Sequence, residues 1–379
     1  MNSVESTLSL KNEVMLGWKM IDIDGSIGEG GGQVLRTSLA LAAVLRREVR
    51  VFNIRAGRGE PGLKAQHLTG AKALTQICSA SSKGLQIGST EFTFSPGALR
   101  AGFFRFDVGT AGSITLVLQT LMPLLPFAPG TVEVEITGGT DVKWSPPVDY
   151  LRLVTLPLLD RMDMHASILL VKRGHYPKGG GIVRLKATPT SVLKNILGID
   201  SGNVNAVTGV SHSVKLPRRV AERQASAATR VIEEKGLQRP QIQIEASENG
   251  SHLGPGSGIV LCATRNNGGV LGGDSLGERG RPADTVGEDA ARKLLEEISS
   301  SAFLDRHMGD MIVPYVALAA GVSDVSISQV TMHAFTNVKV AEQVAGVRFD
   351  SLPEIGMPGK LRVKGLGLRR EEVSVSPRE

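Results

Sequence analysis

Cysteine, aromatic residues and long apolar runs are all scarce in this sequence. Cys78 and Cys262 are the two cysteines among 379 residues, and neither has a partner at zinc or redox spacing. This excludes a disulfide framework and favours a reducing compartment. Aromatic residues make up 4% of the chain, which argues against single-strand binding by extended base stacking. No apolar stretch approaches the length of a membrane span, so we expect a cytoplasmic protein with no membrane partner.

Length and charge set the next limits. A chain of 379 residues is long enough for two domains, or for one large domain with an insertion. Its formal net charge is +6 and its pI is near 9.4. A mildly basic chain suits an anionic partner such as RNA or a nucleotide, although many unrelated enzymes share this value.

The two ends of the chain carry little sign of structure. Residues 1–19 contain charges throughout and lack the apolar core of a signal peptide. We therefore expect residues 1–19 to be a disordered extension, with Met20 as an alternative start. Residues 366–379 are expected to be a loose tail.

One pattern, of helix, strand, polar loop and second helix, recurs three times along the chain. The first helix and the loop begin at residues 33 and 55 in one copy, at 113 and 138 in the next, and at 310 and 333 in the third. The number of residues from the start of the first helix to the start of the loop is similar in all three copies, which favours a repeat. If the copies pack around one axis, their loops converge on one cleft; the alternative is three solvated turns. The loop residues that suit a nucleotide site are Arg55, Arg58, Asp141, Trp144, Pro146, Pro147, His333 and Asn337.

The third copy contains the stretch SISQVTMHAFTNVKVAE (326–342), in which a β-rich run leads to His333, a short polar loop and a helix. Taken alone, His333 is most simply a residue that ends a strand. A nucleophile or a metal ligand are the other interpretations, and other motifs have to decide among the three.

A glycine-rich run, IDIDGSIGEGGGQVLR, covers residues 21–36. Its alternating start predicts a half-buried strand, and a glycine loop followed by a helix N-terminus forms an anion site. The run is neither a Walker A motif nor a dinucleotide fingerprint. Glu29 would repel a phosphate unless a divalent cation lies between them, and Arg36 could face the same anion. The alternative is a tight turn that needs glycine for positive φ.

A second run, KRGHYPKGGGIVRL (172–185), combines basic residues with three successive glycines. It allows close approach of the backbone to a negatively charged group. The alternative is a β-bulge or hairpin at a domain junction.

Five separated motifs resemble those of the RNA 3′-terminal phosphate cyclases. They are DGSIGEGGGQVLR (24–36), IRAGRGEPGLKAQH (54–67), DVGTAGSITLVLQTLMP (107–123), RGHYPKGGGIV (173–183) and TMHAFTN (331–337). The resemblance implies an α+β fold of three repeated βαβαββ-type units around a common axis, each similar to a translation initiation factor C-terminal module. The large catalytic domain would comprise residues 20–186 and 282–365. A smaller α/β domain would be inserted at 187–281, and the helix at 284–298 would complete the third unit.

The resemblance also implies an ATP-dependent activity. The histidine attacks the α-phosphate of ATP, AMP passes to an RNA 3′-phosphate, and the ribose 2′-hydroxyl expels AMP to close a 2′,3′-cyclic phosphate. In this scheme His333 is the adenylated nucleophile and Glu29 helps to hold Mg²⁺ or Mn²⁺. The groups that the resemblance assigns to ATP or AMP are Gln119, Pro146, Pro147, His307, Asp310, Met311 and Asn337, with Asn337 helping to orient His333. Those assigned to phosphates or the RNA end are Arg36, Arg55, Arg58, Gln66 and His67.

Two residues depart from the family pattern. His307 stands where an aromatic Tyr is familiar, and it can still stack on adenine. Met311 stands where a glutamine is familiar, which removes one expected hydrogen bond to the nucleotide. Two alternatives remain open: a noncatalytic branch of the family that acts in ribosomal RNA processing, and enolpyruvyl transferases of similar fold. The first lacks the nucleophilic histidine, and the second lacks the RGHYPKGGG signature.

Overall fold

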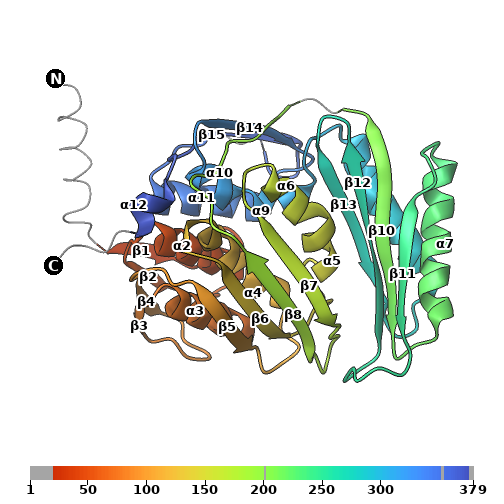
Figure 1. Cartoon of the computed structure of the whole chain (residues 1–379), viewed down its shortest axis with the longest axis horizontal. Helices are drawn as coiled ribbons and strands as arrows, with labels where there is room; N and C mark the ends of the chain where they lie inside the picture. The colour runs from red at the N-terminus through yellow and green to blue at the C-terminus, as the bar shows by residue number, and fades with distance from the viewer. Residues whose placement is uncertain (1–19, 200–201, 351–353, 375–379) are drawn as a thin grey trace.

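The computed structural model describes residues 20–199, 202–350 and 354–374. It has a mixed α+β fold with four sheets, and helices cover these sheets (Figure 1). The expected α+β class is confirmed. The predicted extension at residues 1–19 lies outside the described residues.

The first sheet has the strand order β1-β2-β4-β3. Strands β1 and β2 are parallel, and the remaining pairs are antiparallel. Parallel neighbours need a crossover, and helix α2 (Gly32–Leu45) provides it. Helix α3 (Ala65–Ile77) follows β2. The strands span Ile21–Asp24 (β1), Val49–Phe52 (β2), Ser81–Lys83 (β3) and Phe92–Ser95 (β4).

The second sheet has the order β5-β6-β8-β7, with the same sequence of parallel and antiparallel pairs. Its crossover begins as α4 (Ile114–Leu121) and continues as the 3-10 helix η1 (Met122–Phe127). Prolines at 123 and 126 cannot donate the hydrogen bonds that an α-helix needs. The segment after Pro147 is helical and consists of α5 (Val148–Tyr150), the π-helical turn η2 (Leu151–Thr155) and α6 (Leu156–Asp160). The strands span Gly102–Asp107 (β5), Val132–Gly138 (β6), Ala166–Lys172 (β7) and Gly181–Ala187 (β8).

The third sheet is shorter, with the order β15-β14-β9. It is formed by Leu197–Gly198 (β9), Val322–Ile327 (β14) and Gly359–Lys364 (β15), and is accompanied by α9 (Arg306–Met311), α10 (Val313–Leu318) and α11 (Met332–Ala345). The arrangement of three units around a common axis stays a prediction. A short helix, α12 (Arg370–Ser374), follows, and Val373 is buried in the core. The expected loose tail is therefore anchored as far as this residue.

The fourth sheet, in the order β11-β10-β12-β13, lies at one side of the molecule (Figure 1). Its elements are β10 (Val204–Val214), α7 (Arg218–Glu234), β11 (Gln241–Ser247), β12 (Gly256–Arg265) and β13 (Val270–Leu276). Helix α8 (Ala283–Ser299) shares an apolar cluster with this sheet and α7 through Val286, Ala290 and Leu294. We expected α8 to complete the third unit, but its apolar face packs here. We call this sheet with α7 and α8 the side unit. Residues 187–199, expected to belong to the insert, include β9, which pairs with β14.

The start of α11 differs from the sequence prediction. We expected the strand to extend to residue 332 and a polar loop to hold His333. Strand β14 ends at Ile327, and α11 begins at Met332 because the Thr331 hydroxyl accepts a hydrogen bond from the Ala334 amide. His333 and Asn337 therefore lie on the first and second turns of one helix.

Helix α2 lies at the centre of the main core. Its residues from Val34 to Val44 are buried on all sides, and an apolar helix of this kind belongs inside a protein. Apolar side chains from the first three sheets and their helices join it in one core. No helix in the described part of the chain is long and apolar enough to span a membrane.

Candidate active site

The glycine-rich loop before α2 packs directly against α11. Gly28 has φ +65°, and a Cβ there would lie 2.1 Å from the Thr336 hydroxyl oxygen. A side chain at this position would push the loop away from the helix. The glycine therefore serves both the turn and the close approach, and it brings Glu29 beside His333.

The carboxylate of Glu29 lies next to an arginine and a histidine. Its Oε2 atom lies 3.0 Å from Nη2 of Arg58 and 3.6 Å from Nε2 of His333. The three side chains come from the glycine-rich loop, the loop at 55–62 and α11. All three are partly exposed, with 38% of Glu29 and 41% of His333 accessible to solvent. A ligand can therefore reach the imidazole.

The surroundings of His333 favour its neutral form. Burial lowers the pKa of His333 most, and the positive charges of Arg36 and Arg58 act in the same direction. Glu29 opposes them and raises the pKa, but the net shift is downward. A neutral imidazole has a free lone pair and can act as a nucleophile near neutral pH. The position of His333 in the first turn of α11 also suits a bound anion, because free backbone N–H groups lie there.

Arg36 is the charged group held deepest beside this loop. Its guanidinium donates to Oε1 of Gln33, and burial lowers the pKa of Arg36 to about 10. The arginine therefore stays charged at neutral pH although its side chain is buried. A Cβ at Gly32 would lie 2.2 Å from Nε2 of His67 and 3.0 Å from Nη1 of Arg36. Gly32, the last glycine of the run, thus leaves room for two of the predicted phosphate-binding residues.

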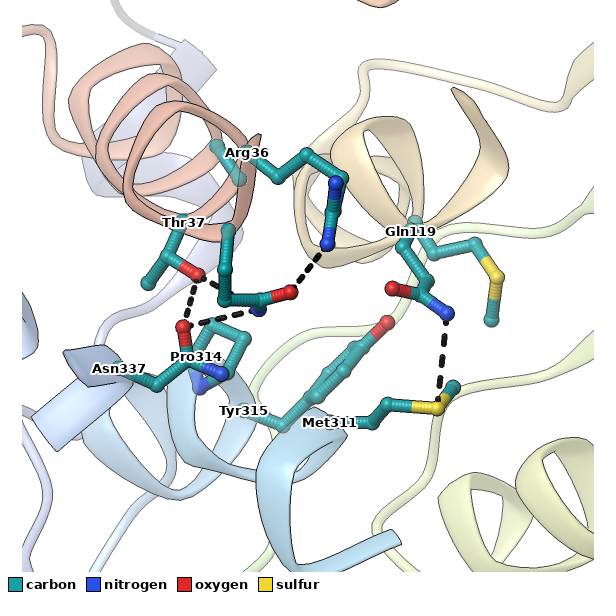
Figure 2. Close-up of a pocket in the computed structure, with 10 residues that line it drawn as sticks. Arg36, Thr37, Gln119, Met311, Pro314, Tyr315 and Asn337 are labelled. Atoms are coloured by element: carbon teal, nitrogen blue, oxygen red, sulfur yellow. Dashed lines mark hydrogen bonds between the residues drawn. The ribbon is translucent and has the colours of Figure 1, made fainter. Parts of the chain in front are cut away.

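Arg36 also lines a pocket between α2, α4, α10 and α11 (Figure 2). In the close-up, Gln119 faces Met311, and the distance from Gln119 Nε2 to Met311 Sδ is 3.6 Å. The free space at the centre of the pocket is about 20 Å³. The lining residues are Gln33, Arg36, Thr37, Ala40, Gln119, Met122, Met311, Pro314, Tyr315 and Asn337.

Asn337 on α11 forms hydrogen bonds with residues of both α2 and α9. Its Oδ1 accepts hydrogen bonds from Gln33 Nε2 at 2.9 Å and from Thr37 Oγ1 at 2.6 Å. Its Nδ2 donates to the Asp310 carbonyl at 2.7 Å. The side chain is fully buried. These three hydrogen bonds fix α2 and α9 relative to α11, and none of them reaches His333.

Asp310 is linked to the start of α11, the helix that carries His333. Its carboxyl accepts from the Thr331 hydroxyl, which also caps α11. Burial raises the pKa of Asp310 well above its usual range. Burial therefore favours the neutral form of this carboxyl.

His307 and the proline pair border the same region. His307 is exposed on α9, and its ring meets Tyr150 edge to face with 6.2 Å between centroids. Tyr150 follows Pro147, which precedes α5, and the Pro146 carbonyl accepts from Thr115 Oγ1 at 2.7 Å. These contacts bring the proline pair, α4 and α9 into one neighbourhood.

The remaining predicted residues are held by local contacts. Gln66 Oε1 accepts from the Ser113 amide at 2.9 Å and so links α3 to the start of α4. His67 Nδ1 accepts from the Lys64 amide at 3.2 Å. Arg55 donates to the carbonyls of Glu60 and Gly62 in its own loop, so its guanidinium is not directed at Glu29. Arg58 makes that contact instead.

Several residues of the site were not predicted from the sequence. Gln33 and Thr37 lie on the same face of α2 as Arg36, and this helical spacing was the signal that could have revealed them. Tyr315 lies in an apolar helix, and nothing in its surrounding sequence distinguishes it from a core residue. Thr331 could have been recognised as a helix N-cap.

The second glycine-rich run does not form an open anion site. Arg173 is buried and its guanidinium contacts Asp141, Asp149 and Glu245. Burial alone would lower the pKa of Arg173, but these three carboxylates raise it above its ordinary value. The positive charge of Arg173 is therefore neutralised within the protein.

Comparisons with known proteins agree on one family. A family model described as RNA 3′-terminal phosphate cyclase matches residues 27–351. A protein of Ignicoccus hospitalis named RNA 3′-terminal phosphate cyclase is 52% identical over 93% of this chain and 100% of its own length. Relatives of the same name from Hyperthermus butylicus and Pyrococcus furiosus are 52% and 47% identical, over 92% and 91% of this chain and 98% of each relative.

Among solved structures, the enolpyruvyl transferase NikO from Streptomyces tendae aligns with 94% of this chain and 51% of its own. The TM-score is 0.40 and the identity is 11%. This likeness is too weak to support a shared fold or activity.

Proposed function

Because the chain belongs to the RNA 3′-terminal phosphate cyclase family, we propose that it uses ATP to convert an RNA 3′-phosphate to a 2′,3′-cyclic phosphate. In this reaction it acts as an enzyme of the ligase or nucleotidyl transferase class, and AMP and pyrophosphate are released. The observation that carries the proposal is the contact between Glu29, Arg58 and His333 at the start of α11. It combines a nucleophile, an anion-binding group and a carboxylate at a solvent-accessible point.

In the first step a ring nitrogen of His333 attacks the α-phosphorus of ATP. A P–N bond forms, the bond to the bridging oxygen breaks, and pyrophosphate leaves with the electron pair. The lowered pKa of His333 supports this role because the imidazole must be neutral to attack. Arg58 and Arg36 are positioned to offset the negative charge on the phosphates.

In the second step an oxygen of the RNA 3′-phosphate attacks the histidine-bound AMP, which releases His333 and forms a phosphoanhydride. AMP now serves as the leaving group that a terminal phosphate monoester lacks. In the third step the neighbouring 2′-hydroxyl attacks the RNA phosphorus, and AMP leaves as the ring closes. Because the hydroxyl is already tethered beside phosphorus, this step gains from proximity.

We assign the adenosine to the region around α4 and α9. Gln119, Asp310, Met311 and Asn337 border or support this region. Pro146 or Pro147 would face one side of adenine, and the exposed ring of His307 would face the other. Arg55, Gln66 and His67 lie beside the loop that holds Arg58, and we assign them to the phosphates or the RNA end.

A divalent cation fits next to Glu29. This carboxylate is accessible, and Mg²⁺ or Mn²⁺ is commonly held by one carboxylate together with phosphate oxygens and water. The ion would neutralise phosphate charge and allow the glycine-rich loop to tolerate a polyphosphate despite Glu29.

The same proposal includes three repeated units around a common axis, with the side unit inserted before the third.

The test is the mass of the intact protein after incubation with ATP and Mg²⁺ or Mn²⁺, for wild type and His333→Ala. We expect one AMP adduct on wild type and none on the variant. The adenylated protein should then convert an RNA with a 3′-phosphate to the cyclic phosphate. Folded wild type without an adduct would favour the noncatalytic branch that acts in ribosomal RNA processing.

A further inference from the structure

Two histidines and an aspartate meet in the interior where the side unit contacts the second sheet. Asp141 follows β6, His175 lies between β7 and β8, and His212 belongs to β10 of the side unit. All three are almost completely buried, with exposed fractions of 3%, 6% and 1%. The predicted nucleotide site does not use His175 or His212, so their chemistry needs a separate account.

The donor atoms of these residues converge. Nε2 of His175 lies 3.0 Å from Nε2 of His212, and each of these atoms lies 4.0 Å from Oδ2 of Asp141. In a tetrahedral zinc site with Zn–N bonds of about 2.0–2.1 Å, ligand atoms are about 3.3 Å apart. The observed distances between the donor atoms lie on either side of this value. Small side-chain adjustments would therefore let all three atoms contact one ion.

The state of the two rings also suits a metal. Burial lowers the pKa of both His175 and His212, which keeps the imidazoles neutral. A neutral ring can direct the Nε2 lone pair at a metal if its proton is on Nδ1. Within the described residues neither Nδ1 has a hydrogen-bond partner. Among these residues, only the hydrogen bond between the two rings therefore requires a proton on an Nε2 atom.

The charge around the cluster favours a cation. Arg173 contacts Asp141, Asp149 and Glu245, and Arg152 contacts Asp149. Two positive charges thus face three carboxylates, which leaves one negative charge beside two neutral histidines. A buried uncompensated charge is unfavourable, and a bound cation would offset it.

The backbone is adapted to the position of the rings. A Cβ at Gly256 would lie 2.1 Å from the His175 ring, and a Cβ at Gly258 would lie 3.0 Å from the His212 ring. The loops that hold the other ligands are joined as well, because the Thr140 amide donates to the Gly174 carbonyl at 2.8 Å. Three segments far apart in the sequence therefore hold the donor atoms in place.

We propose that Asp141, His175 and His212 bind a divalent transition-metal ion of the zinc class. Two imidazoles and one carboxylate suit zinc and its neighbours, whereas Mg²⁺ and Ca²⁺ prefer oxygen ligands. The ion is structural, since its ligands are closed to solvent. It joins the side unit to the loop that leads to Pro146 and Pro147. This inference does not depend on the proposed cyclase activity.

The test uses the full-length protein, stripped with a chelator and dialysed, without ATP. Zn²⁺ is titrated by calorimetry, and bound zinc is counted by elemental analysis after desalting. We expect one zinc per chain for wild type and a dissociation constant raised at least about 100-fold in the double variant His175→Asn/His212→Asn. His165→Asn is the matched control, because this exposed histidine pairs with Asp160 and is not a member of the cluster. Its zinc binding should equal that of wild type.

A second measurement keeps the inference testable if the double variant fails to fold. Zinc X-ray absorption of the wild-type complex should show scattering from two imidazole rings. Folded wild type that binds no zinc would overturn the proposal and leave a His175–His212 hydrogen bond as the explanation. Equal zinc binding by the folded double variant, or a zinc spectrum with fewer than two imidazoles, would overturn it as well.

Discussion

Nε2 of His333 lies 3.6 Å from Oε2 of Glu29, although the two residues belong to opposite ends of the described chain. The contact exists because the glycine-rich loop packs on α11 at Gly28 and Thr336. In the proposed reaction, this carboxylate would hold a divalent cation beside the phosphates that meet the imidazole. The first predictions examine this pair and the packing beneath it.

Replacement of His333 by alanine should abolish adenylation and leave the fold intact. The side chain is 41% exposed at a helix start, so its loss removes little packing, and the free energy of unfolding should change by less than about 0.5 kcal/mol. Intact mass and denaturant unfolding measure the two effects. His165→Ala is the matched control and should still be adenylated. An AMP adduct on His333→Ala would show that another residue is the nucleophile.

Replacement of Glu29 by alanine should slow adenylation in a way that added metal partly relieves. Without the carboxylate, the cation is held less tightly next to the phosphates. The measurement is the adenylation rate of wild type and variant over a range of Mg²⁺ or Mn²⁺ concentrations. Glu60→Ala is the control, since Glu60 pairs with Lys64 in the neighbouring loop. Equal rates for wild type and Glu29→Ala at limiting metal would contradict the metal assignment.

Gly28→Ala should reduce adenylation by about 10- to 100-fold. The new methyl would overlap the Thr336 hydroxyl, and φ of +65° is unfavourable for alanine by about 1–2 kcal/mol. The loop would then shift and move Glu29 from His333. Gly57→Ala provides the comparison, because no atom lies within 4 Å of its Cβ position. If both variants were equally active, the packing of the loop on α11 would have no part in adenylation.

Asn337→Ala should lower the free energy of unfolding by about 2–4 kcal/mol. It removes the hydrogen bonds of Asn337 with Gln33, with the buried Thr37 hydroxyl and with the Asp310 carbonyl. Denaturant titration of wild type and variant measures the change. Asn195→Ala removes an exposed bond to the Val322 carbonyl and should change stability by less than about 1 kcal/mol. A similar small effect at Asn337 would mean that its buried bonds contribute little.

The free energy of unfolding should decrease as the pH is lowered below about 6.5, in part because of His67. Burial, followed by the charges of Arg36, Arg55 and Lys64, lowers the pKa of His67 to about 3. The unfolded chain, with a histidine pKa of about 6.5, takes up this proton first as pH falls. The contribution is therefore fully present above pH 6.5 and decreases by about 1.4 kcal/mol per pH unit toward the folded pKa.

The measurement is denaturant unfolding of wild type and His67→Gln between pH 4.5 and 6.5. Glutamine can still accept from the Lys64 amide but does not titrate. The variant should therefore show a shallower loss of stability over this range. Parallel curves for the two proteins would show that His67 is not held neutral in the folded state.

Local pattern was sufficient for many elements of the fold. Strand β1 lies where the alternating start of the first glycine-rich run predicted a strand, and α2 follows the glycine loop as expected. The start of α11 was misplaced because the apolar residues near 330 continue the pattern of a strand. The Thr331 cap decides the helix start through one side-chain hydrogen bond. The partner of α8 was also wrong, since an amphipathic face indicates burial and not the surface that covers it.

The sequence by itself determined the α+β class, the family and the residues that carry reactive groups, because these depend on residue type, spacing and order. Tertiary structure alone decided which of them meet. It placed Arg58, and not Arg55, against Glu29, and it directed the charge of Arg173 inward to three carboxylates. It also brought His175 and His212 within 3.0 Å. Such contacts join segments that are distant along the chain, and their distances follow from how the core packs.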